Sequence, residues 1–111
     1  MIRFDFDHIP EITLPNFKGG EGDFFASMYT DEQNKILKGR LPAGSTIGLH
    51  IHDISSEIIF ILSGRGKVIL DDKTDILSAG DCHYCPQGHS HSLINDGTDE
   101  LVFYAVVPRH D

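Results

Sequence analysis

Short apolar segments and turn residues alternate along this chain. Stretches rich in Ile, Val, Phe and Leu are separated by frequent Gly, Pro and Asp residues, and no long stretch has the spacing of an amphipathic helix. This pattern is typical of an all-β sandwich or barrel. The predicted strands cover residues 23–29, 36–41, 46–52, 57–62, 66–71, 74–77, 81–85, 90–95 and 100–107.

The segment before the second of these strands has two interpretations. Thr30-Asp31-Glu32-Gln33 has the form of a helix capping box, whose side chains satisfy the backbone groups of a first helical turn. Residues 31–38 are therefore compatible either with a short helical start or with a turn between two strands. The sequence leaves both open.

Residues 58–62, Ile-Ile-Phe-Ile-Leu, are apolar at every position rather than at alternate ones. Both faces of this strand therefore favour burial, although a barrel encloses only one of them. Either the amino-terminal segment, with Phe4, Phe6 and Ile9, covers the outer face or a second copy of the chain does. On this ground we expect a homodimer.

Length and charge narrow the class of protein. With 111 residues the chain has room for one compact domain, and we expect an N-terminal segment over residues 1–22 and a barrel domain over residues 23–108. Nine basic and seventeen acidic residues give a formal charge of −8, which repels nucleic acid and anionic membranes. No segment has the apolar length of a membrane span or signal peptide. We expect a cytoplasmic protein with neither kind of partner.

The two cysteines, Cys82 and Cys85, lie in the sequence CHYC. In an extended strand, residues with this spacing point to opposite faces and lie about 10 Å apart, beyond the ~7 Å that a disulfide tolerates. A single C-x-x-C without a second ligand pair is also a weak zinc motif. We therefore expect two ordinary, partly buried thiols.

The sequence GSTIGLHIHDISSE, residues 44–57, places polar side chains inside a strand-forming region. Because alternate side chains of a strand share a face, His50 and His52 project together, and Glu57 opens the next strand, where its carboxylate can meet them. His91, at the start of a later strand, can reach the same point. Burying such groups is costly unless they coordinate a cation. They therefore predict a site for one divalent transition metal: Mn, Fe, Co, Ni, Cu or Zn.

These residues fall in two motifs through which the chain resembles the cupins. The first motif, G-x5-H-x-H-x4-E-x6-G, spans residues 44–64, and the second, G-x5-P-x-G-x2-H-x3-N, spans residues 80–95. Every specified position is matched, by Gly44, His50, His52, Glu57, Gly64, Gly80, Pro86, Gly88, His91 and Asn95.

The resemblance is to a small single-domain cupin with a conserved barrel of the cupin 2 type. It implies a jelly-roll barrel (double-stranded β-helix) of two antiparallel sheets. It also implies that three histidines and one glutamate hold one metal ion inside this barrel. One or two coordination positions of the ion would then stay open to water or substrate.

Two further histidines, His83 and His89, lie within the second motif at positions that the motif does not specify. Spacing from Pro86 favours His91 over His89 as the ligand. His89 then becomes a candidate catalytic proton shuttle at the pocket mouth, or simply an exposed side chain. His83 is expected to face solvent or a neighbouring sheet.

A metal ion with these ligands would keep a net charge near +1, and its open positions favour small oxyanionic ligands such as carboxylates and enolates. We therefore expect a metal-dependent enzyme acting on a small organic molecule, with dioxygenase chemistry as the leading hypothesis. A redox-silent lyase, isomerase or decarboxylase is the alternative, although sugar-phosphate chemistry is disfavoured because few Lys or Arg residues lie near the motifs. A non-catalytic metal- or ligand-binding module is the third interpretation.

Overall fold

The structure, a computed structural model, describes residues 2–110, and its regular secondary structure consists of strands apart from two short 3-10 turns. The strands are β1 (Ile12–Pro15), β2 (Asp23–Thr30), β3 (Asn34–Leu41), β4 (Thr46–Ile51), β5 (Glu57–Ser63), β6 (Arg65–Leu70), β7 (Lys73–Ser78), β8 (Cys82–Cys85), β9 (Ser90–Ile94) and β10 (Leu101–Pro108). Two short 3-10 turns are η1 (Phe6–His8) and η2 (Phe17–Gly19). Every strand predicted from the sequence is present to within a few residues, and β1 is an additional strand.

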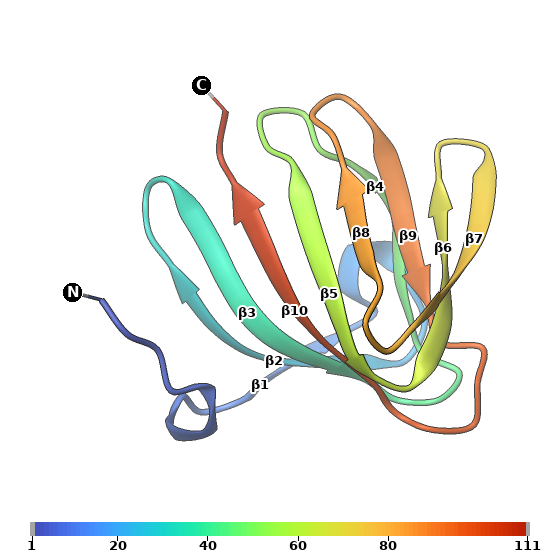
Figure 1. Cartoon of the computed structure of the whole chain (residues 1–111), viewed down its shortest axis with the longest axis horizontal. Helices are drawn as coiled ribbons and strands as arrows, with labels where there is room; N and C mark the ends of the chain where they lie inside the picture. Colours follow the sequence, from blue (N-terminus) through green and yellow to red (C-terminus); the bar gives the residue numbers. More distant parts are fainter. Residues whose placement is uncertain (1, 111) are drawn as a thin grey trace.

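The strands form two antiparallel sheets that face each other as the walls of a jelly-roll barrel (Figure 1). One sheet has the order β1-β2-β3-β10-β5-β8, and the other has the order β4-β9-β6-β7. Strands β4 and β5 are consecutive in the chain but belong to different sheets. The connection after β4 therefore crosses from one wall to the other. The predicted all-β fold of two antiparallel sheets is confirmed.

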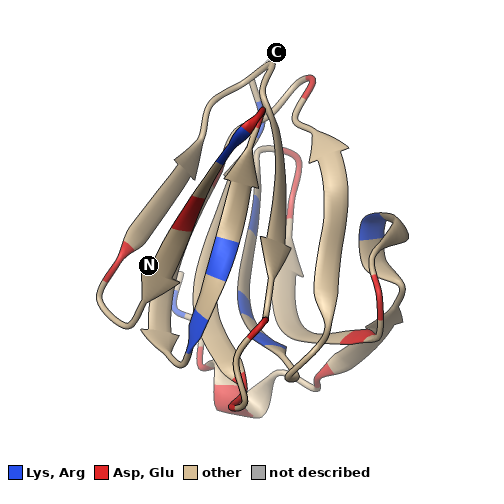
Figure 2. Ribbon diagram, turned by 90° about the vertical axis from the view of Figure 1, so that its right-hand side faces the viewer, with Lys and Arg blue, Asp and Glu red and all other residues tan. Residues whose placement is uncertain are grey.

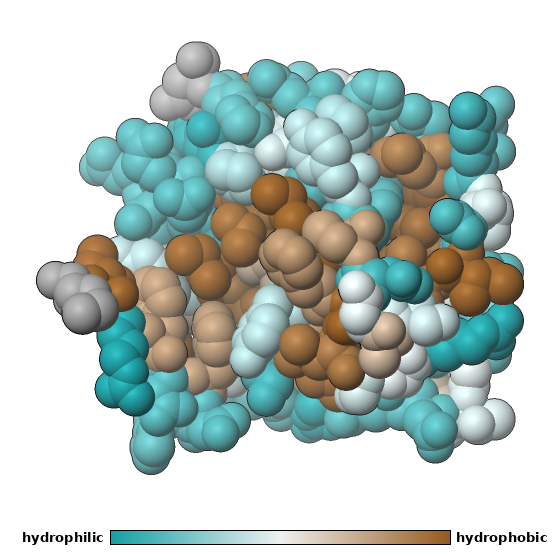
Figure 3. Space-filling view, viewed as in Figure 1, coloured by the Kyte–Doolittle hydropathy of each residue, from teal (hydrophilic) through white to brown (hydrophobic). Residues whose placement is uncertain are grey.

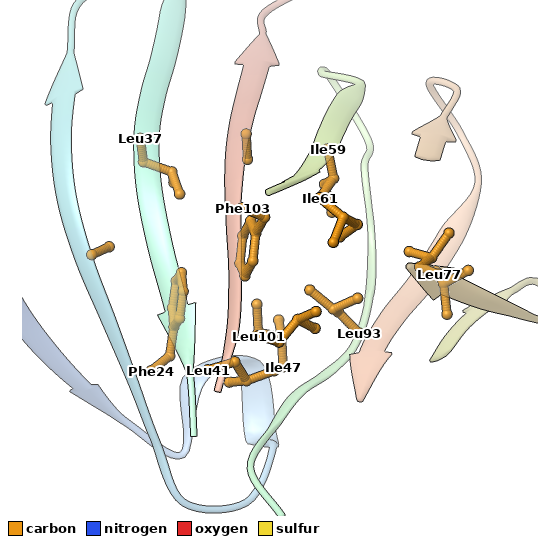
Figure 4. Close-up of a cluster of buried hydrophobic side chains, with 13 residues drawn as sticks. Phe24, Leu37, Leu41, Ile47, Ile59, Ile61, Leu77, Leu93, Leu101 and Phe103 are labelled. Atoms are coloured by element: carbon orange, nitrogen blue, oxygen red, sulfur yellow. The ribbon is translucent and has the colours of Figure 1, made fainter. Parts of the chain in front are cut away.

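Alternation of side chains along the strands places the core between the two sheets. On β10, Leu101, Phe103 and Ala105 are buried, and on β5 the same is true of Ile59 and Ile61 (Figure 4). Side chains at the intervening positions point out of the barrel, as the period of a strand requires. The packed interior fixes the strands that carry the polar residues described below.

Gly39 on β3 makes room for two stacked aromatic rings in this core. The rings of Phe24 and Phe103 have centroids 5.8 Å apart and an interplanar angle of 5°. A Cβ atom at Gly39 would lie 2.7 Å from Cε1 of Phe24 and 2.9 Å from Cζ of Phe103. The two rings thus occupy the space that any other side chain at this position would need.

The segment with the capping-box sequence is a turn between β2 and β3, so the helical interpretation of residues 31–38 is wrong. Oδ1 of Asp31 accepts hydrogen bonds from the backbone N–H groups of Gln33 at 2.9 Å and Asn34 at 2.8 Å. Asp satisfies backbone donors in turns in the same way as at helix starts. The pairing of β3 with β2 and β10 then provides more backbone hydrogen bonds than one helical turn.

The amino-terminal segment packs on the outer face of the six-stranded sheet. The ring of Phe4 lies 4.6 Å from that of Tyr29 on β2, and the ring of Phe6 lies 5.6 Å from that of Tyr104 on β10, measured between centroids. β1 then pairs with β2 along its whole length. The amino-terminal segment therefore covers part of the outer faces of β2 and β10, whereas the sequence predicted a cover for residues 58–62, which lie in β5.

Part of the same outer face stays exposed over β5 and β8. Phe60 on β5 is 47% exposed within the single chain. Apolar side chains gather across the middle of the surface over β10 and β5 (Figure 3). The exposed large side chains on these strands are Phe60, Leu62, Tyr84 and Tyr104. A second copy of the chain as their cover stays a prediction.

Cys82 and Cys85 lie at opposite faces of β8, the first exposed and the second buried. Neither takes part in a disulfide. The prediction of two unlinked thiols is confirmed, because an extended strand keeps residues of this spacing apart.

Many acidic residues lie in the turns and at strand ends, and they outnumber Lys and Arg (Figure 2).

Across residues 2–110, no helix has the length and apolar character that crossing a membrane requires.

Candidate metal centre

Four polar side chains from both sheets meet inside the barrel. His50 lies on β4 and His91 on β9, and these residues are paired across the two strands. Glu57 begins β5 in the other sheet, and His52 follows β4 in the connection between the sheets. One donor atom from each residue lies within 4.8 Å of all the others. The structure therefore brings together the four residues that the sequence predicts as metal ligands.

The distances between these donor atoms fit a single cation. Oε1 of Glu57 lies 2.8 Å from Nε2 of His91 and 3.1 Å from Nε2 of His52. The Nε2 atoms of His52 and His91 are 2.9 Å apart, and Nε2 of His50 lies 4.0 Å from Oε1 of Glu57. Two ligands about 2.1 Å from one metal ion lie about 3.0 Å apart in neighbouring positions and about 4.2 Å apart in opposite ones. The donor set therefore fits a transition-metal ion.

The outer nitrogens of the imidazoles are held by further contacts. Nδ1 of His50 donates a hydrogen bond to the carbonyl oxygen of Gly48 at 2.7 Å, so its Nε2 carries the lone pair. Nδ1 of His52 lies 2.9 Å from Oγ of Ser55. Such contacts are typical of metal-binding histidines, because they fix the ring orientation and the tautomer. The lone pairs are thus directed to the centre of the cluster.

His83 provides the corresponding contact for His91, and of its two expected surroundings the structure shows the neighbouring sheet. His83 does not face solvent: it is 7% exposed, and its Nε2 lies 2.9 Å from Nδ1 of His91, on β9 of the other sheet, inside the barrel. The reason is the alternation of side chains along β8, in which His83 and Cys85 are buried and point inward. The shared parity with a cysteine, a residue type that is often buried, is the signal in the sequence that indicates this position.

The pKa shifts of Glu57 and His50 have the directions that binding of a cation requires. Burial opposes the charge of Glu57, but hydrogen bonds and charges from His52 and His91 outweigh it and lower the pKa of Glu57 to about 2. Burial lowers the pKa of His50, and it lowers the pKa of His83 to about 4, so both rings are neutral near pH 7. Metal binding requires an ionised carboxylate and neutral imidazoles.

His89 lies outside this cluster. Its side chain is 47% exposed, and Nδ1 lies 2.7 Å from Oδ2 of Asp71. The residues before and after it, Gly88 and Ser90, form backbone hydrogen bonds with His52 and Asp71, respectively. His89 does not line the cavity described next. A role for it as a proton shuttle stays a prediction.

The four residues form part of the wall of a cavity of about 290 Å³. The rest of its wall is mainly apolar and comes from both sheets. These apolar side chains include Phe17, Phe24, Met28, Leu37, Ile47, Ile59, Leu93, Phe103 and Val107. An organic ligand could therefore lie against an apolar surface with one end at the donor atoms.

Two lysines, Lys18 and Lys35, also line this cavity. Both lie outside the motif segments, at η2 and on β3. The sequence argument looked for basic residues only near the motifs and therefore missed them. Contacts between segments that are distant in the sequence, η2 with β4 and β3 with β10, place these two lysines at the cavity.

The fold and the site define a class of protein. Residues 38–107 match the cupin domain family, and the chain belongs to this family. The resemblance based on the two motifs is confirmed, and the cluster of three histidines and one glutamate makes this cupin a candidate metal-binding protein.

Individual relatives support the same class. The chain is 38% identical over 101 residues to the oxalate-binding protein of Thermotoga maritima, which covers 85% of this chain and 83% of that protein. A crystal structure described as a predicted oxalate decarboxylase from Thermotoga maritima is similar with a TM-score of 0.91 and 29% identity, over 97% of this chain and 99% of that one. The cupin domain of a Schizosaccharomyces pombe protein has the same fold, with a TM-score of 0.79 and 14% identity over 97% of this chain and 74% of that one.

Proposed function

We propose that this cupin binds one divalent transition-metal ion through His50, His52, Glu57 and His91 and uses it to bind a small carboxylate. The observation that carries the proposal is the convergence of three imidazole nitrogens and one carboxylate oxygen at the wall of a largely apolar cavity. With four protein ligands, the ion, one of Mn, Fe, Ni, Co, Cu or Zn, would offer open positions and a positive charge to carboxylate oxygens.

The chain's own residues contribute binding and orientation. His83, Gly48 and Ser55 hold the outer nitrogens of the histidines. The apolar wall would reduce the contact of a bound ligand with water, which would strengthen each charge interaction inside the cavity. The name of the Thermotoga maritima oxalate-binding protein supports a small dicarboxylate as ligand.

Element analysis of untagged protein tests the metal first. We expect about one equivalent of metal per chain, a large loss of it in His50→Ala and in Glu57→Gln, and no loss in His8→Ala, which removes an exposed histidine outside the cluster. Calorimetric titration with oxalate then compares metal-loaded with metal-free protein. Retention of metal in both cluster variants, or equal oxalate affinity with and without metal, would refute the proposal.

Catalysis by oxygen insertion into an organic substrate is the second candidate. The apolar wall beside the donor atoms favours a substrate with a carbon skeleton. A dioxygenase reaction would consume O₂ and place both oxygen atoms in the product. Oxygen uptake with diketones, flavonols and thiols, compared with anaerobic incubation, tests it. Substrate loss that continues without O₂ would instead indicate a decarboxylase, lyase or isomerase, and binding without turnover would indicate a non-catalytic module.

The exposed outer face of β5 and β8 supports a homodimer. Large apolar side chains at a surface of this kind favour association with another protein surface. Light scattering should give the mass of two chains, and Phe60→Ser should lower it towards one. A wild-type mass of one chain would refute the dimer.

The location of the protein is proposed to be cytoplasmic. Two free thiols, Cys82 and Cys85, are compatible with a reducing compartment. Cell fractionation followed by immunoblotting tests the location.

A further inference from the structure

Lys35 lies on the wall of the cavity in the sheet that faces the metal-binding histidines of β4 and β9. Along β3, Lys35 has the same parity as Leu37 and Gly39, which are buried, so its side chain starts on the inner face of the sheet. It is half-buried and lines the same cavity as the four donor residues. Lys35 and the candidate cation site thus line one compartment.

The strand register gives the separation of these two features. Lys35 on β3 is paired with Val107 on β10, and Val106 is paired with Ile58 on β5. Glu57, one residue before Ile58, therefore lies level with Val107 and two strands away from Lys35. Neighbouring strands lie about 4.8 Å apart, so the two Cα atoms are about 10 Å apart on the same concave face. Side chains that start at this distance and enter one cavity leave space for a few atoms between them.

Lys35 has no acidic partner within residues 2–110. Its neighbours of like charge on the same strand do: Nζ of Lys38 lies 3.9 Å from Asp7, and Arg40 contacts Glu11 at 2.7 Å and Glu100 at 2.8 Å. These two side chains start on the outer face of β3, opposite to Lys35. In a chain of charge −8 acidic partners are abundant, yet the inward-facing lysine has none. An unpaired ammonium in a half-buried position is costly and favours an anion in the cavity.

We propose that Lys35 is a specificity residue that binds the far anionic group of a ligand whose near carboxylate is held at the metal centre. This inference rests on the function proposed above and narrows its ligand class. The ligand would be a dicarboxylate with an apolar spacer, longer than oxalate, since Met28, Leu37 and Phe103 contribute apolar wall to the cavity.

The other charged residues that line the cavity, apart from Glu57, are less suited to binding the far end of the ligand. Lys18 is exposed, and its Nζ lies 5.5 Å from the centre of the Phe17 ring. Asp53 is also exposed. Exposed charges are screened by water and contribute little to binding. Lys35 is therefore the basic residue in the better position to distinguish a charged ligand end from a neutral one.

Calorimetric titration of the Co²⁺-loaded protein tests the proposal, with glutarate and its monoamide, glutaramate, as probes. The two molecules have nearly the same shape, and glutaramate lacks the second negative charge. A charged hydrogen bond predicts that the wild-type protein prefers glutarate by about tenfold. Lys35→Met should remove this preference by weakening glutarate alone, and Lys35→Arg should retain it. Lys38→Met is the matched control on the same strand and should behave as wild type.

The absorption bands of Co²⁺ report separately that each variant still folds and holds the metal. If the wild-type protein does not distinguish the two probes, or if Lys35→Met keeps the preference, the role of Lys35 is refuted while metal-dependent oxalate binding can still stand. If the Co²⁺-loaded protein binds none of oxalate, glutarate and glutaramate, the proposed function itself fails.

Discussion

Replacement of His83 by Phe should weaken metal binding although His83 is not one of the four ligands. The change keeps an aromatic ring on the inner face of β8 and removes the nitrogen that lies 2.9 Å from Nδ1 of His91. His91 is 2% exposed, so water cannot replace the lost partner. The Nδ1–H group of His91 would then be buried without a hydrogen bond, and the ring would lose its fixed tautomer.

The magnitude follows from these contacts. Loss of one partner from a buried hydrogen bond costs about 1–3 kcal/mol. Loss of an outer contact of a metal-binding histidine lowers metal affinity by about 10- to 100-fold, which corresponds to about 1.4–2.8 kcal/mol. The two ranges overlap, as expected if the same hydrogen bond determines both.

Competition of the protein with a fluorescent zinc chelator measures the affinity directly. His8→Phe is the control, because it removes a histidine whose side chain is 83% exposed and distant from the cluster. His83→Gln should recover part of the affinity, since its amide can again contact Nδ1 of His91. Affinity within twofold of wild type in His83→Phe would refute the reasoning. A loss equally large in His83→Phe and in His8→Phe would refute it as well.

Three further predictions concern pH and packing. Protons compete with metal for the imidazoles, so metal affinity should fall as the pH falls. Because burial lowers the pKa of His50, half of the metal should be released only below the pKa of about 6.5 of a free imidazole. Element analysis after dialysis at stepped pH measures this, and loss of the metal above pH 7 would contradict it. Gly39→Ala should lower the free energy of unfolding by about 1–3 kcal/mol, because the added Cβ would overlap the rings of Phe24 and Phe103. Urea unfolding measures this change, and an unchanged urea midpoint would be inconsistent with the stacking of these rings. Asn95→Ala should lower the free energy of unfolding by about 2–4 kcal/mol, because this fully buried amide donates hydrogen bonds to two carbonyl oxygens and accepts one from a backbone N–H. Thermal unfolding measures the change, and an unchanged melting temperature would contradict the prediction.

The sequence predicts those features that depend on local periodicity. Strand positions follow from alternation, and His50 and His52 share a face because they are two residues apart on an extended chain. The motif positions also place Glu57 and His91 correctly, since fixed spacings link each of them to a turn. The turn at Asp31 is harder, because the same side chain satisfies backbone groups in a helix start and in a hairpin.

Features that depend on pairing between distant strands could not be predicted in this way. Lys35 enters the cavity because β3 lies beside β10, and neither strand carries a motif residue at that level. His83 contacts His91 because β8 and β9 belong to different sheets whose inner faces meet. β1 has only four residues, and its pairing with β2 rather than its own composition makes it a strand.

The donor atoms come from both sheets, and this origin has a mechanical consequence. A bound ion would be a non-covalent cross-link between β4 and β9 on one wall and β5 on the other. At a free metal concentration 100 times the dissociation constant, such a ligand adds about 2.7 kcal/mol to the stability of the folded state. The free metal concentration would therefore determine the melting temperature of this barrel and its resistance to proteolysis, as well as its ability to bind a ligand.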